Sequence, residues 1–446
     1  MHRWLVSAAF CIGPVAASAQ VLPKIPIESY SLPNGLKVIL SPDRSTQVVT
    51  VDVWYDVGSR NEARGRTGFA HLFEHMMFQG SANVKKGEHF ALIERAGGNT
   101  NGSTAEDRTN YYQMLPSNRL NLGLWLEADR MRSLTVSDSN FRNQREAVKE
   151  ERRLRVENAP YAAVIFEGLF ALQDSTTCFP YAHSSIGSMA DLDAARVEDV
   201  QAFFNLHYAP NNATLVVTGD FDPPTARAMI EEYFGTIPRG RDRPAVECTP
   251  RFSPGLVRRP WPDPKATLPA VFVAYRTPPY SDPDHPALVL LGNILGQGES
   301  SRLNRSVVRD QRLAQGIFAG ANLPSPRRGP GVLFLAAIAN QGVAVDSLDH
   351  AVRREVDRLL TEGVPQAELE KAKNAFVTGK IQQQQISLFL AEAIQEANMF
   401  LGDPNQVNAD PGRFLAVTTA DLKRVAAKYL TPDNALVFLV TAGGAQ

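Results

Sequence analysis

The first half of the chain combines the periodicities of strands and helices. Apolar residues alternate with polar ones at 35–43, at 46–59 and again at 212–223, which predicts strands. At 118–131 and 139–158 the apolar residues recur instead at helical spacing. These patterns predict a domain that mixes helices and strands.

The same order of elements begins again after a segment without periodicity. Residues 238–264 are rich in Pro and Arg and predict an interdomain linker. Patterns typical of a strand, a helix and two further strands follow at 269–278, 285–296, 331–339 and 434–442. A chain of 446 residues is too long for one ordinary core, so we expect two similar domains, at 20–237 and 265–446.

One short stretch, GFAHLFEHMMFQG at residues 68–80, has two chemically different faces if it is helical. An apolar stripe at i, i+3, i+4, i+7 and i+8 is formed by Phe69, Leu72, Phe73, Met76 and Met77. His71, Glu74 and His75 project from the other side. The two histidines are one turn apart, so both can converge on one atom.

The pattern H-x-x-E-H suits a catalytic zinc site. Two imidazoles and one carboxylate leave a fourth position of Zn²⁺ open for water, which implies catalysis rather than a structural role. Thr67 and Gly80 predict the two caps of the helix. The alternative is a solvated helix face that happens to hold two histidines.

Composition and charge exclude some classes of partner. Apolar residues make up 44% and charged residues 21%, which is typical of a soluble globular protein. The formal net charge of −1 gives no concentrated basic surface. We therefore expect neither nucleic acid nor an anionic membrane as a partner.

The N-terminus has the pattern of a secretory signal peptide. A basic Arg3, an apolar run over 4–17 and the sequence ASA before Gln20 predict a signal at residues 1–19 and export across the inner membrane, to the periplasm. The run is shorter than the roughly 20 residues that a membrane span needs. No later segment approaches a span.

The mature chain keeps two cysteines, Cys178 and Cys248. In an oxidising compartment they can pair, but two buried free thiols fit the sequence equally well.

H-x-x-E-H is the inverzincin signature, and the residues around it resemble the start of the pitrilysin family of zinc peptidases. The likeness is carried by DVGSRNEARGRTGFAHLFEHMMFQGS, GGNTNGSTAEDRTNYYQMLP, NQREAVKEERRLRVENAPY, YAPNNATLVVTGDFDP and GQGESSRL. It implies an α+β fold of two similar halves. Each half is a twisted, mainly antiparallel sheet covered by helices, and the two enclose a cavity.

The resemblance also implies the third zinc ligand, a glutamate on a later helix. The family spacing puts it at Glu151, 151 − 75 = 76 residues after the second histidine. Glu150 is the alternative, but Val148 and Leu154, three residues to either side of Glu151, favour an inward face at Glu151. Gln144 stands where the family often has a second glutamate, and its amide can orient a neighbour but cannot act as a base.

These residues together imply peptide hydrolysis. One Zn²⁺ per chain, held by His71, His75 and Glu151, would activate water and polarise a peptide carbonyl. Glu74 would accept the water proton and pass it to the leaving amine. The alternative role for Glu74 is only to orient its neighbours.

A possible substrate-binding edge comes next in the chain. Asn101, Gly102 and Ser103 precede the β-prone segment 109–115, and we interpret this region as an exposed strand edge that pairs with an extended, unfolded peptide. The residues alone fit a flexible loop equally well, and the resemblance favours the edge. His183, a lone loop histidine, is not taken as a ligand.

The second half lacks a pair of residues that the family supplies there. The family has an arginine and, seven residues later, a tyrosine, which stabilise the oxyanion; the matching positions here are Val308 and Gln315, with Arg309 one residue away. Some bacterial members are split between a zinc-bearing chain and a metal-free chain. We therefore expect a heterodimer in which a metal-free homologous subunit supplies Arg and Tyr. The alternative is a non-catalytic scaffold or assembly subunit of the same family.

Overall fold

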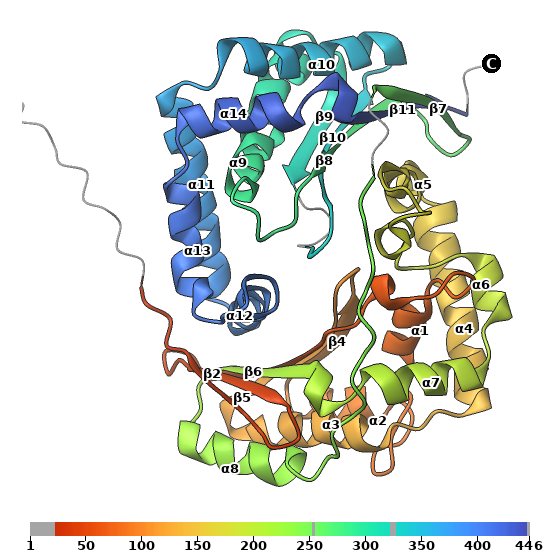
Figure 1. Ribbon diagram of the computed structural model, residues 1–446, viewed down its shortest axis with the longest axis vertical. Helices are drawn as coiled ribbons and strands as arrows, with labels where there is room; N and C mark the ends of the chain where they lie inside the picture. Colours follow the sequence, from red (N-terminus) through yellow and green to blue (C-terminus); the bar gives the residue numbers. More distant parts are fainter. Residues whose placement is uncertain (1–22, 252–254, 322–326, 444–446) are drawn as a thin grey trace, which may run out of the picture.

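The computed structural model describes residues 23–251, 255–321 and 327–443. The described residues form two sheets, one in each half of the chain (Figure 1). The first has the strand order β1-β2-β6-β3-β5-β4 and the second β7-β11-β8-β10-β9. Most neighbouring strands are antiparallel, the described exceptions being β2 with β6 and β7 with β11. The expected α+β architecture of two sheet-and-helix halves is confirmed.

The first half builds one core from one face of its sheet and the helices that cover it. Its strands are β1 (Glu28–Ser31), β2 (Lys37–Pro42), β3 (Val48–Tyr55), β4 (Asn99–Thr104), β5 (Thr109–Pro116) and β6 (Ala213–Gly219). Its helices are α1 (Phe69–Met76), α2 (Glu88–Arg95), α3 (Leu120–Ser133), α4 (Asp138–Arg152), α5 (Ala162–Phe166), α6 (Met189–Ala194), α7 (Val197–His207) and α8 (Pro223–Phe234). The apolar stripe of α1 is buried in this core, as its spacing predicts.

The second half repeats the arrangement with its own core. Its strands are β7 (Val257–Asp263), β8 (Ala270–Thr277), β9 (Ala314–Ala321), β10 (Gly331–Ala339) and β11 (Ala435–Ala442). Its helices are α9 (His285–Gly296), α10 (Val345–Glu362), α11 (Gln366–Gln384), α12 (Ser387–Leu401), α13 (Gln406–Leu415) and α14 (Thr419–Tyr429). Buried residues of α9, α10, α11 and α14 pack on one face of the second sheet.

Each half also covers the second face of the other half's sheet. Leu390 and Ile394 of α12 pack on Ile39 and Val216 of the first sheet. In the opposite direction, Val164 of α5 belongs to an apolar cluster with residues of the second sheet. Figure 1 shows α12 reaching down to β2 and β6, and α5 beside β11. The halves are therefore interlocked, in the sense that a helix of each half packs on the sheet of the other, and they are not joined by the linker alone.

The linker is shorter than the sequence predicts. Residues 257–263, expected to be irregular, form β7 and pair in parallel with residues 436–442 of β11. The two prolines in this segment favour an irregular linker over a strand, but β7 is the edge strand of its sheet. Proline is tolerated at an edge because the missing N–H costs no ladder hydrogen bond there.

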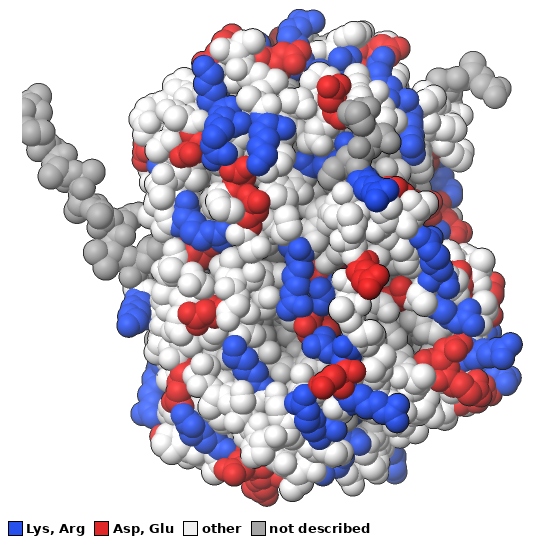
Figure 2. Space-filling view, in the orientation of Figure 1, with Lys and Arg blue, Asp and Glu red and all other residues white. Residues whose placement is uncertain are grey.

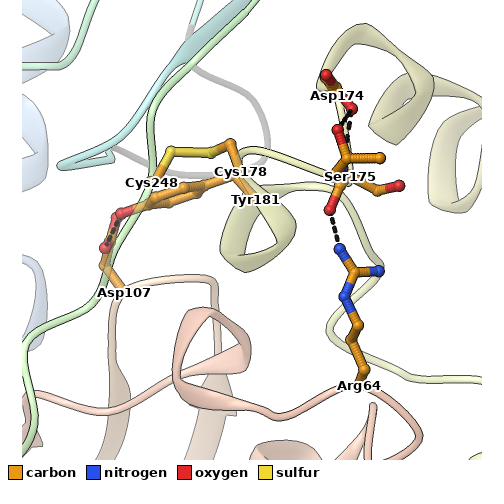
Figure 3. Close-up of a disulfide and its surroundings, with 8 residues drawn as sticks. Arg64, Asp107, Asp174, Ser175, Cys178, Tyr181 and Cys248 are labelled. Atoms are coloured by element: carbon orange, nitrogen blue, oxygen red, sulfur yellow. Dashed lines mark hydrogen bonds between the residues drawn. A yellow bond between two sulfur atoms is a disulfide. The ribbon is translucent and has the colours of Figure 1, made fainter.

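A disulfide fastens the remaining linker to the first half. Cys248 is bonded to Cys178, which settles the question that the sequence left open (Figure 3). Beside it the Tyr181 hydroxyl donates to Asp107 at 2.7 Å. The linker is therefore covalently attached to the first half.

The expected signal peptide, residues 1–19, lies outside the described residues. Within the described residues, no helix has both the length and the apolar character needed to cross a membrane. In the view of Figure 2, basic and acidic side chains are interspersed over both halves.

Candidate metal centre

Helix α1 starts in a different way from the one its sequence suggests. Its N-cap is Gly68, in the left-handed conformation with φ 87, and not Thr67. The Thr67 backbone N–H and hydroxyl both donate to Asp191, at 2.9 and 2.5 Å. The helix ends at Met76, so Gly80 lies four residues beyond its last residue, and both predicted caps are wrong.

The N-terminus of α1 is instead capped by Glu62, which sequence reasoning missed. Its two carboxylate oxygens accept hydrogen bonds from the Gly68 and Ala70 N–H groups, each at 2.8 Å. Burial raises the pKa of this carboxyl, while the backbone N–H groups act in the opposite direction. Glu62 lies six residues before Gly68, too far for a capping box. No local rule of sequence therefore points to it.

The structure brings His71, His75 and Glu151 together. Their ligand atoms all lie within 4.8 Å of one another. The Nε2 atoms of His71 and His75 are 3.7 and 3.3 Å from one Glu151 oxygen. The other oxygen of Glu151 is 2.9 Å from the Arg155 guanidinium. Two imidazole nitrogens and a carboxylate that converge in this way fit the donor set of zinc.

The electrostatics of the cluster also suit a cation. Burial, with His75 close by, lowers the pKa of His71 to about 4, so its imidazole is neutral at pH 7 and free to bind metal. The hydrogen bond to His75 lowers the pKa of Glu151. Burial alone would lower the pKa of His75, but its hydrogen bond to Glu151 and the Glu74 carboxylate raise it. A bound cation would compete with protons for these groups.

The structure distinguishes Glu151 from Glu150. The Glu150 side chain is 57% exposed and pairs with Arg153 at 2.9 Å, whereas Glu151 is 19% exposed. Val148 is buried, as expected, but Leu154 is 59% exposed, contrary to expectation. The helix changes to a π-helical turn at Arg153–Glu157, which shifts the helical register after α4, so that Val156 is buried and Leu154 is exposed.

Glu74 lies beside the cluster but outside its ligand set. The Thr104 hydroxyl of β4 donates to a Glu74 oxygen at 2.7 Å. Burial raises the pKa of Glu74, and this hydrogen bond opposes the shift. On the other side, the Gln144 carbonyl oxygen lies 3.3 Å from Nδ1 of His75. Thr104 is a second residue that the sequence did not indicate, because only the fold places β4 against α1.

Asn101, Gly102 and Ser103 lie on β4, the edge strand of the first sheet. The predicted edge segment 109–115 is instead β5, an inner strand between β3 and β4. Gly102 faces the site, because a Cβ atom there would lie 3.2 Å from Cγ of Glu74. The hydrogen-bonding edge next to Glu74 is therefore β4 itself.

Two other sets of residues stand apart from the cluster. Arg309 lies in the last turn of a π-helical segment (Asn304–Asp310), where it is exposed and pairs with Asp310. Gln315 lies on the edge strand β9. His183 stacks on Phe179 and lies 3.6 Å from Glu62, rather than with the ligand set.

Comparison with known proteins places this site in a family. Residues 37–171 match the model described as Insulinase (Peptidase family M16), and residues 194–376 match the Peptidase M16 inactive domain. The zinc protease PqqE of Helicobacter pylori is 31% identical over 428 residues, covering 92% of each chain. The chain belongs to the M16 peptidase family. The pitrilysin-like resemblance is thereby confirmed.

Solved structures agree with this membership. A protease from Helicobacter pylori superposes with a TM-score of 0.86 at 29% identity, covering 94% of this chain and 100% of the other. The periplasmic protease PqqL from Escherichia coli has a TM-score of 0.76 at 19% identity. It covers 94% of this chain, but only 48% of PqqL itself is matched. The fold of this chain therefore matches about half of the longer PqqL chain.

Proposed function

We propose that this M16 chain is a zinc-dependent endopeptidase that hydrolyses unfolded peptides or short protein segments. The observation that carries the proposal is the convergence of His71, His75 and Glu151 within 4.8 Å, with Glu74 beside them. The bound zinc would supply Lewis acidity and a water of lowered pKa. The relatives named zinc proteases support the choice of metal.

Each of the other groups has a distinct part in this proposal. Glu74 accepts the proton of the attacking water and delivers it to the leaving amine, and the Thr104 hydrogen bond holds its carboxylate in place. Gln144 accepts a hydrogen bond from His75 and fixes the orientation of that ring. The backbone of Asn101–Ser103 on β4 pairs with the extended peptide.

We further propose that the active form is a heterodimer. The described part of the second half has Val308 and Gln315 where an arginine and a tyrosine would stabilise the oxyanion, and Arg309 is turned to solvent. The 48% coverage of PqqL supports an enzyme made of two units of this size. A metal-free homologous subunit would supply the missing pair. Export to the periplasm, through a signal at residues 1–19, is part of the same proposal.

The alternative is a non-catalytic scaffold or assembly subunit. It is favoured by the match of residues 194–376 to the M16 inactive domain. The scaffold needs no metal, whereas the peptidase needs one zinc per chain.

Metal analysis and peptide cleavage decide between the two. The purified chain should hold one zinc, and cleavage of unfolded peptides should stop with a chelator and return with zinc. Glu74→Gln should keep the zinc and lower kcat by about 10²- to 10⁴-fold, because an amide cannot act as the base. Adding the metal-free subunit should raise kcat by about 10²- to 10³-fold, the usual effect of an oxyanion donor. Full activity of the isolated chain contradicts the heterodimer, and absence of zinc contradicts the peptidase.

A further inference from the structure

The residues that follow the third candidate ligand form a turn of uncommon geometry. Helix α4 ends at Arg152, and Arg153–Glu157 continue it as a π-helical turn. The Asn158 N–H closes this turn by donating to the Arg153 carbonyl at 2.7 Å. Single π-helical turns are rare and are frequently found at functional sites. This one begins two residues after Glu151, so it shapes the surroundings of that carboxylate.

The arginines in and before this turn have different partners. Arg152 is buried and donates to a backbone carbonyl of the loop before α6 at 2.9 Å. Arg153 pairs with Glu150, and the side chains of both are exposed. Arg155 instead reaches the candidate metal centre, because its guanidinium nitrogen Nη1 lies 2.9 Å from Oε1 of Glu151.

The two carboxylate oxygens of Glu151 therefore face different groups. Oε2 faces His71 and His75, whose Nε2 atoms lie 3.7 and 3.3 Å away. Oε1 is bound by Arg155 at a distance typical of a charge-assisted hydrogen bond, which is roughly twice as strong as a neutral one. Rotation of the carboxylate would break this bond. The ion pair thus fixes which oxygen faces the two histidines.

This ion pair is poorly placed to stabilise the fold. The Arg155 side chain is 69% exposed, and an ion pair with an exposed partner contributes little to folding. The Glu151 side chain, in contrast, is only 19% exposed, and both imidazoles of the cluster face it. A bond that adds little to folding but fixes a candidate ligand atom points to a role at the metal centre.

A second polar side chain fixes the cluster from the other end of the same helix. The carbonyl oxygen of Gln144, seven residues before Glu151, lies 3.3 Å from Nδ1 of His75. Arg155 follows Glu151 by four residues, which is the spacing of neighbours on one helix face. Gln144 thus orients a ligand ring, and Arg155 orients the ligand carboxylate. Hydrogen bonds from such partners orient metal ligands and tune metal affinity.

We propose that Arg155 is a positioning residue of the metal centre, which holds Glu151 so that a single oxygen is offered to the zinc. The proposal rests on the proposed function, because it takes His71, His75 and Glu151 to be zinc ligands. A carboxylate can bind a metal through one oxygen or through both. While Oε1 is bound to the guanidinium, three protein ligands leave the fourth position of zinc to water, as in catalytic zinc sites.

Zinc affinity gives the first test, by titration of the full-length chain against a chromophoric chelator. Arg155→Gln should weaken zinc binding by about 10- to 100-fold, the usual effect of losing a group that orients a metal ligand. Arg155→Lys keeps a charged donor without the planar fork, so it should recover part of the loss.

The matched control is Arg153→Gln, which removes the neighbouring arginine and its exposed ion pair with Glu150. It should leave zinc affinity within about twofold of the wild type. Equal zinc affinity in Arg155→Gln and Arg153→Gln overturns the proposal. The melting temperatures of the two metal-free variants should agree. If metal-free Arg155→Gln melts well below Arg153→Gln, Arg155 acts through the fold and the proposal is wrong.

A second test reports how the metal is held rather than how tightly. Co²⁺ in place of Zn²⁺ absorbs visible light strongly when it is four-coordinate and weakly at higher coordination numbers. The cobalt-saturated wild type and Arg153→Gln should absorb strongly. Arg155→Gln should absorb more weakly, because Oε1 of Glu151 becomes free to bind the metal. An unchanged spectrum in cobalt-saturated Arg155→Gln overturns the proposal.

Hydrolysis at saturating zinc, by the chain together with its metal-free subunit, separates this proposal from the proposed function. Arg155→Gln should lower kcat even when fully loaded with zinc. If it changes neither zinc affinity, the cobalt spectrum nor kcat, the role of Arg155 is contradicted while the peptidase stands. If zinc affinity and the cobalt spectrum depend on Arg155 but no peptide is cleaved, the peptidase is contradicted while the positioning role stands.

Discussion

Helices α1 and α9 occupy comparable places in the two halves, each packed on its own sheet, yet only one of them carries candidate chemistry. In α1 one side is buried and the other presents His71, Glu74 and His75. In α9 nearly every residue is buried, including its one histidine, His285. Burial lowers the pKa of His285 to about 3, so it is a neutral core residue. The apolar positions thus set the shared architecture, and a few polar positions set the function.

The two edge strands show the same contrast. In the first half Gly102 of β4 leaves just enough room for the Glu74 side chain. In the second half the close approach is made by a glycine of the helix α9, because a Cβ on Gly296 would lie 2.4 Å from Cβ of Ala319 in β9. Close approach of backbone therefore serves a candidate site in one half and plain packing in the other.

The largest expected effect compares the two histidine-bearing helices. His75→Ala removes one of the three proposed zinc ligands and should reduce zinc from one per chain to near zero, with complete loss of hydrolysis. His285→Gln should lower the melting temperature and leave one zinc per chain, because His285 is buried and does not belong to the cluster of possible metal ligands found in the described structure. Zinc content by mass spectrometry of the purified variants is the measurement. Full zinc occupancy in His75→Ala would falsify the ligand assignment.

The next effect separates two neighbouring carboxylates on α4. Glu151→Ala should lose zinc and activity, because it removes the oxygen that both histidines face. Glu150→Ala should change neither by more than a few-fold, since it removes only an exposed ion pair worth about 0–1 kcal/mol. Titration with a chromophoric zinc chelator gives both affinities. The reverse result would assign the third ligand to Glu150.

Much of the difference between the two halves was predictable from local patterns of sequence. The helical spacing of α1, the convergence of its histidines and the order of strands and helices all depend on residues close in sequence. The roles of Glu62 and Thr104 were not predictable, because each depends on contacts that the fold makes and not on a local pattern of sequence. The predicted cap at Thr67 failed for the same reason, since a distant carboxylate, Asp191, binds Thr67.

Removal of the disulfide measures how much the attachment of the linker to the first half contributes to the stability of the chain. Replacing Cys178 and Cys248 by serine opens a loop of 70 residues and should destabilise the chain by about 2–4 kcal/mol, mainly by freeing the unfolded state. Zinc content should not change, because the halves stay interlocked through α5 and α12. Thermal unfolding of the variant, and of the wild type with and without reductant, measures the loss. An unchanged melting temperature would mean that the interlocked helices alone set the stability.

The smallest expected effect concerns the carboxylates at the starts of α1 and α9. Glu62 accepts the Gly68 and Ala70 N–H groups of α1, whereas Asp284 before α9 is bound by the side chains of Lys428, Arg424 and Tyr429. Glu62→Gln places an amide NH₂ against one of these N–H groups and should cost about 1–2 kcal/mol of stability, the range of a lost cap or an unpaired buried donor.

Substitution of Glu62 and substitution of Asp284 should have different effects on zinc affinity. His71 is the residue after Ala70, so a loosened first turn in Glu62→Gln should weaken zinc binding several-fold. Hydrogen bonds from Lys428, Arg424 and Tyr429 lower the pKa of Asp284 although burial opposes the shift. Its stabilising effect is therefore present at neutral pH and lost as the pH falls through the lowered pKa. Asp284→Asn should accordingly lower the melting temperature at pH 7, less so in acid, and leave zinc affinity unchanged. If both variants weaken zinc binding equally, Glu62 acts through the overall stability of the chain and not through the position of α1.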